Sequence, residues 1–181
     1  ALLHSVVENV PEDLEPLMIV TPPITRVEAG ETQLVRFIGT LQEPLKTQRL
    51  KRVTFEGIPQ ARVGGGATIG ITLRQNLPLI LHPRGLPVHH SPWELLKWRR
   101  AGERLTVHND SAYVVRLAPE VQLLPQGVLA TLPRTYVLPG EALTLKVEGS
   151  LEGVAGVEIH PATIYGFSAD SHRASIDTDG S

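Results

Sequence analysis

Short apolar runs separated by proline and glycine dominate this sequence and leave little room for helices. The 15 prolines and 16 glycines are scattered along the chain, so few windows remain in which an uninterrupted amphipathic helix could form. Between these breakers lie segments rich in β-branched and apolar residues, such as TQLVRFIGT, RVTFEGI, ATIGITLRQ and ALTLKVEG. Their length and spacing are typical of antiparallel strands in β-sandwiches. We therefore expect an all-β protein.

The segment HPRGLPVHHSP is dense in proline and glycine and separates two strand-rich parts. We expect an immunoglobulin-like domain at residues 1–83, a linker at 84–91, a second immunoglobulin-like domain at 92–170 and a polar tail at 171–181. Only about four convincing strands precede the linker, against roughly seven in a complete immunoglobulin sandwich. The first domain is therefore expected to lack its N-terminal strands.

Charge and composition exclude several classes of function. Lys and Arg total 17 against 19 Asp and Glu, which predicts no broad surface for nucleic acid. The chain has no cysteine, so it forms no disulfide and no thiolate zinc site. No apolar run is long enough to span a bilayer, so membrane insertion is not expected. Neither a metal-ligand spacing nor a catalytic signature occurs, so we expect no enzyme, no metal and no cofactor.

The stretch ATIGITLRQNLPLILHPRG alternates as a half-buried strand does. Ile69, Ile71 and Leu73 share one face of this strand. An ordinary strand that covers its own core would show this pattern. So would an edge strand that offers backbone groups and an apolar row to another polypeptide. Pro78 favours an edge position, because proline cannot donate a ladder hydrogen bond.

Four motifs, in this order, resemble those of the periplasmic chaperones of the chaperone–usher pathway, the PapD-like family. They cover nearly the whole chain, and several ordered motifs in register are more specific than any one alone. The motifs are VENVPEDLEPLMIVTPPITRVEAGETQLVRF, FEGIPQ, ITLRQNLPLILHPRGLP and WELLKWRRAGERLTVHNDSAYVVRL.

This resemblance implies two immunoglobulin-like domains without enzymatic activity. In the family, the last long strand of the first domain inserts into a pilin subunit whose own sandwich lacks a strand. By position, Ile69, Ile71 and Leu73 match the donor side chains. The implied function is a periplasmic chaperone that stabilises fimbrial subunits and delivers them to an outer-membrane usher.

The chain departs from the family where the subunit's C-terminal carboxylate is anchored. Family members use an Arg near the mature N-terminus and a Lys late in the donor strand. The Lys position corresponds to Pro78, and the Arg would lie before Ala1. Arg74 lies on the same strand face as Pro78, and we hypothesise that it replaces part of the missing positive charge.

A second departure concerns the family's interdomain cluster of one Arg and two acidic residues. Arg36 fits the Arg, whereas Gln48 and Ile164 occupy the acidic positions. Interdomain contacts are therefore expected from apolar groups around Tyr165. The customary Arg of the linker is replaced by His82.

A structural pilin or adhesin is the alternative, because such proteins share the sandwich architecture. Its signature would be one incomplete domain with an N-terminal donor extension, whereas this chain indicates two domains and an internal donor strand. An incomplete first domain would expose strand edges, so self-association through those edges is also expected.

Overall fold

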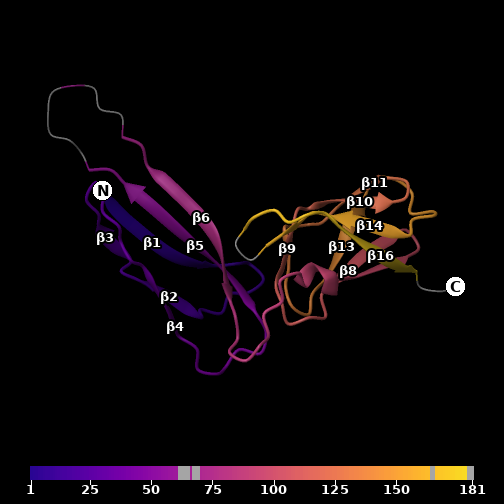
Figure 1. Cartoon of the computed structure of the whole chain (residues 1–181), viewed down its shortest axis with the longest axis horizontal. Helices are drawn as coiled ribbons and strands as arrows, with labels where there is room; N and C mark the ends of the chain where they lie inside the picture. Colours follow the sequence, from indigo (N-terminus) through magenta and orange to yellow (C-terminus); the bar gives the residue numbers. More distant parts are fainter. Residues whose placement is uncertain (61–65, 67–69, 164–165, 179–181) are drawn as a thin grey trace. The chain divides into compact units, whose positions relative to one another are not determined.

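A computed structural model of the chain describes residues 1–60, 66, 70–163 and 166–178 and shows a nearly all-β protein (Figure 1). Within these residues the helical part is one short 3-10 helix, η1 (Pro92–Leu95). The chain divides into two compact units. Unit 1 holds Ala1–Leu45 and Leu50–Leu81, and unit 2 holds Lys46–Arg49 and His82–Ser181. The predicted all-β fold class is confirmed.

Unit 1 consists of a four-stranded sheet and a two-stranded sheet (Figure 1). The larger sheet has the order β3-β1-β5-β6, with β1 (Leu2–Asn9), β3 (Ile24–Arg26), β5 (Arg49–Ile58) and β6 (Leu73–Leu81). The smaller sheet pairs β2 (Met18–Thr21) with β4 (Arg36–Gly39) in antiparallel orientation.

Alternation along β1 and β5 separates an apolar face from a polar face. Val7 lies opposite Val53, and Glu8 lies opposite Arg52 on the other face. Val53 is buried, so the face that it shares with Val7 belongs to the core of unit 1. The polar face extends onto β6, where the candidate site lies.

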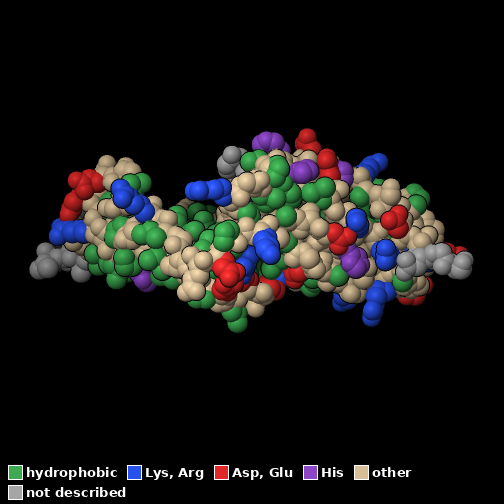
Figure 2. All heavy atoms as spheres, turned by 90° about the horizontal axis from the view of Figure 1, so that it is seen from below, with side chains coloured by type: hydrophobic (Ala, Val, Ile, Leu, Met, Phe, Trp, Pro, Cys, Tyr) green, Lys and Arg blue, Asp and Glu red, His purple; other side chains and the backbone are tan. Residues whose placement is uncertain are grey.

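The two-stranded sheet carries large apolar side chains at the surface. Ile19 and Ile38 are cross-strand partners, and both are exposed. Figure 2 shows hydrophobic side chains at the surface of unit 1, at the left, with basic and acidic side chains interspersed over the whole visible face. Every residue of β4 is exposed.

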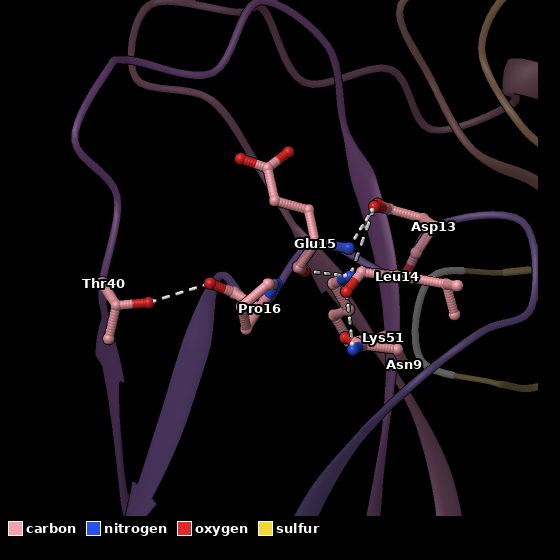
Figure 3. A network of polar contacts seen from close by, with 7 residues as sticks. All are labelled: Asn9, Asp13, Leu14, Glu15, Pro16, Thr40 and Lys51. Carbon is pink, nitrogen blue, oxygen red and sulfur yellow. Dashed lines mark hydrogen bonds and ion pairs between the residues drawn. The ribbon is translucent and has the colours of Figure 1, made fainter.

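A fully buried lysine holds the loop between β1 and β2. Lys51 on β5 has no exposed surface. Its Nζ donates to the carbonyl oxygens of Asp13 at 2.8 Å and Glu15 at 2.7 Å, and lies 3.4 Å from Asp13 Oδ1 (Figure 3). An ammonium group has three donors, and three oxygens surround this one. This matching of donors and acceptors offsets the cost of burying the charge.

Two further side chains hold the backbone of the same loop (Figure 3). Asn9 Nδ2 donates to the carbonyl of Leu14 at 3.0 Å, and Thr40 Oγ1 donates to the carbonyl of Pro16 at 3.1 Å. Together with Lys51, they bind the carbonyls of four consecutive residues, 13–16. The loop therefore has a fixed path although it lies outside any strand ladder.

Unit 2 contains ten strands in two sheets. Seven form a closed set in the order β10-β11-β13-β8-β7-β16-β14, and three form a sheet in the order β12-β9-β15. Its core surrounds Trp98 and Leu105, both buried. The strands are β7 (Lys97–Ala101), β8 (Arg104–His108), β9 (Val115–Leu117), β10 (Glu120–Leu124), β11 (Val128–Thr131), β12 (Tyr136–Val137), β13 (Ala142–Val147), β14 (Gly156–Ile159), β15 (Pro161–Ala162) and β16 (His172–Thr178).

The prediction of a polar tail at 171–181 is wrong for residues 172–178. These residues form β16, which pairs antiparallel with β14 and parallel with β7. Ile176 is buried in the core, and Ala174 packs against it. The polar residues between them point away from the core, so the composition looked like that of a tail although the alternation is that of a strand.

Replacing Lys51 by Met should lower the free energy of unfolding by about 2–4 kcal/mol, because the loop carbonyls would lose their buried donor. Urea unfolding would measure this difference. Lys46→Met is the matched control, because Lys46 is exposed, and it should change stability by less than about 0.5 kcal/mol. Equal stability of the two variants would contradict the role assigned to Lys51.

Candidate functional site at the edge strand β6

β6 is the last strand of its sheet, next to β5 (Figure 1). Within the described residues no strand pairs with its other edge. Exposure falls along the alternating apolar row: Leu73 is 70% exposed, Leu77 44% and Leu81 7%. Ile71, just before the strand, is 68% exposed. The second half of β6 therefore packs on unit 1, whereas the first half has an uncovered apolar row.

The predicted donor residues are placed unequally. Ile71 and Leu73 carry exposed apolar side chains at the beginning of the site. Ile69 lies outside the described residues. Leu77 continues the same row by alternation, but the sequence analysis did not include it. An open strand edge with exposed apolar side chains at every second position can accept a further strand, because both backbone groups and side chains are available.

The opposite face of β6 joins a polar network. Asn76 Nδ2 donates to Thr54 Oγ1 on β5 at 3.2 Å, and Thr54 Oγ1 donates to Glu8 Oε2 on β1 at 3.4 Å. Arg52 donates through Nε to Asn76 Oδ1, and through Nη2 to the Asn76 carbonyl at 3.3 Å. Arg74 is exposed on β6. Two guanidinium groups therefore come from neighbouring strands, and the sequence analysis identified only Arg74.

The residues predicted for interdomain contacts are only partly described. Arg36 lies exposed on β4 of unit 1, whereas Ile164 and Tyr165 lie outside the described residues. The interdomain role of Arg36 and Tyr165 stays a prediction. Gln48, noted for lacking the expected charge, is buried in unit 2 and hydrogen-bonds His82 at 3.0 Å.

A polar cleft on unit 2 is built differently. It is lined by Lys97, Trp98, Arg99, His108, Asp110 and Asp177. Lys97 Nζ lies 3.0 Å from Asp110 Oδ2, and both side chains are mostly exposed. The hydrogen bond and charge of Lys97 lower the pKa of Asp110. Exposed ion pairs of this kind contribute little to stability, and the arrangement is that of a solvated surface.

Comparison with known proteins identifies both halves of the chain. Residues 1–87 match the model of the PapD N-terminal domain of pili and flagellar-assembly chaperones, and residues 92–171 match that of the pili assembly chaperone PapD C-terminal domain. The chain belongs to the PapD family of pilus-assembly chaperones. A chaperone role in pilus assembly follows from this membership, and the alternative of a structural pilin or adhesin is not supported.

One relative supports the PapD assignment over almost the entire chain. The uncharacterized fimbrial chaperone YhcA of Escherichia coli strain K12 is 35% identical over 173 residues, which cover 95% of this chain and 76% of the relative. In the described part of the chain, no helix is long and apolar enough to cross a membrane.

Solved structures share the fold at lower identity. A structure of the Salmonella enterica SafA pilin in complex with the SafB chaperone matches with a TM-score of 0.72 and 22% identity, over 96% of this chain and 82% of that chain. The E. coli chaperone DraB matches with a TM-score of 0.72 and 20% identity, over the same shares of the two chains. At this identity the likeness shows the fold. The predicted architecture of two PapD-like β domains is thereby confirmed.

Proposed function

We propose that this chain is a periplasmic, non-enzymatic chaperone that binds fimbrial subunits by donor-strand complementation and delivers them to an outer-membrane usher. The observation that carries the proposal is the first half of β6, where an open strand edge coincides with exposed Ile71 and Leu73. A subunit that lacks one strand exposes an apolar groove and unpaired backbone groups. One alternating strand satisfies both.

The energy available from this row is sufficient for stable capture. Full burial of an Ile or Leu side chain contributes about 1.5–3 kcal/mol. Ile71, Leu73 and Leu77 together would contribute roughly 5–9 kcal/mol before the costs of ordering and association. Ile69 would add to the row by its position in the sequence.

Solved complexes support the choice of partner. The SafB chaperone is solved with the SafA pilin, and the CsuC chaperone with the tip subunit CsuE. Both structures share the fold of this chain, with TM-scores of 0.72 and 0.63. A subunit of the same general class is therefore the partner that we propose.

We infer two candidates for anchoring a subunit's C-terminal carboxylate. Arg74 remains the candidate from the sequence. The second is Arg52, because Asn76 and Thr54 are hydrogen-bonded across β6 and β5, which run in opposite directions (Figure 1). Two residues further along each strand, Arg52 faces Pro78. The positive charge absent at position 78 would thus be supplied by the neighbouring strand.

Self-association through a strand edge stays a prediction. β4, whose four residues are all exposed and which pairs only with β2 in the described part of the chain, is the edge to which it applies.

Replacing Ile71 and Leu73 together by Asp should abolish subunit stabilisation, because two carboxylates cannot enter an apolar groove without a large desolvation cost. Co-purification of a fimbrial subunit expressed with the chaperone measures this effect. Thr72→Asp is the matched control, because Thr72 is exposed and lies between the two on the opposite strand face. Full recovery of subunit with the double variant would refute donor-strand binding through this row.

Arg52→Ala should reduce the preference for a free carboxylate by about tenfold, the effect of losing one charge-assisted hydrogen bond. The measurement is titration with a peptide of the subunit's C-terminal segment, carrying either a carboxylate or an amide. Arg74→Ala is tested in parallel, and Arg26→Ala serves as the control because Arg26 lies on β3, at the other end of the sheet. A loss seen only with Arg74→Ala would assign the anchor to Arg74, and an unchanged preference in both would exclude this face.

A further inference from the structure

Gln48 makes three hydrogen bonds within unit 2. Its backbone N–H donates to the carbonyl of Ala112 at 2.8 Å, and its Oε1 accepts the backbone N–H of Val114 at 2.8 Å. Its Nε2 lies 3.0 Å from Nδ1 of His82. The side chain is buried, so water cannot readily replace these partners.

The partners of this cluster determine where its protons lie. The backbone N–H of Val114 is only a donor, so Gln48 must present its oxygen to it and its NH₂ group to His82. His82 Nδ1 must then be an acceptor. On the other side of the ring, His82 Nε2 lies 2.7 Å from the carbonyl oxygen of Leu86, which only accepts. Both contacts therefore select the neutral imidazole with its proton on Nε2.

We propose that Gln48 and His82 form a pH-sensitive clasp. A second proton on Nδ1 of His82 would face the NH₂ donors of Gln48. Turning the Gln48 amide over would offer its oxygen to the ring but would place its NH₂ group against the N–H of Val114. Either arrangement loses one hydrogen bond. The clasp is therefore intact while His82 is neutral and opens as the pH falls through the range in which the imidazole takes up a proton.

The surroundings supply no acidic partner for a charged ring. Within the described residues, the contacts of the His82 ring are those with Gln48 and with the carbonyl of Leu86. The titratable residues along the segments that surround the ring are Lys46 and Arg49 beside Gln48, Arg84 and His89 on the linker, and Tyr113 and Arg116 beside Val114. None of them carries a carboxylate, so protonation of His82 gains no ion pair in return.

The clasp lies where two long strands end. β5 begins at Arg49, directly after Gln48, and β6 ends at Leu81, directly before His82. Opening the clasp would release the chain next to the start of β5 and the end of β6. This inference goes beyond the proposed function, and its test uses the free protein, so it does not depend on whether β6 captures a subunit.

Hydrogen exchange of the Val114 amide reports directly on the clasp, because this N–H is bound to Gln48 Oε1. Its protection factor, corrected for intrinsic exchange, should fall by about tenfold between about pH 7.5 and about pH 5.5. In Gln48→Glu the order should reverse, because a carboxylate accepts from both Val114 and a protonated His82. His82→Phe should remove the pH dependence of this amide.

The ¹⁵N chemical shifts of the His82 ring in the unmodified chain provide a second measurement that needs no variant. At about pH 7.5 they should show the proton on Nε2. A proton on Nδ1 would overturn the proposal. So would a Val114 protection factor that is equal at both pH values, or one that changes in the same direction in the unmodified chain and in Gln48→Glu.

Discussion

The arrangement of unit 1 depends on β5 being paired along both of its edges. β1 lies on one side and β6 on the other, so the backbone groups of β5 are satisfied within the sheet. This allows one strand to serve three surroundings. Val53 faces the core, Lys51 holds the β1–β2 loop, and Arg52 and Thr54 join the polar network beneath β6. β6 is paired on one edge in the described part of the chain, and this difference makes it the strand available to a partner.

Local patterns in the sequence predicted the elements better than their surroundings. Alternation and the proline and glycine breakers indicated an all-β protein, and the ordered motifs indicated the family. Lys51 was not recognised, because a lysine inside a strand is expected to face solvent. Its burial depends on carbonyl oxygens from residues 13 and 15, which no strand pattern predicts. β16 was taken for a tail because its two apolar residues are separated by polar ones that point outward.

The candidate site shows the same division between local and long-range information. Ile71 and Leu73 could be identified because two-residue alternation lies within a single stretch of sequence. Arg52 could not, because its relation to Pro78 depends on the register of β5 against β6. The contact between Gln48 and His82 joins residues 34 positions apart. Sequence analysis recorded each as a departure from the family pattern but had no means of pairing them.

The two departures in charge have one physical explanation in this structure. The cluster around Gln48 places an amide between a backbone N–H and a neutral imidazole, so every donor meets an acceptor without an ion pair. Lys51 shows the opposite solution, because three oxygens converge on its ammonium group and a buried positive charge is tolerated. A carboxylate at position 48 would have no positive partner while His82 is neutral, and its burial would then cost stability. The neutral residue at position 48 is thus matched to the histidine at position 82, so the two substitutions are best understood as a pair.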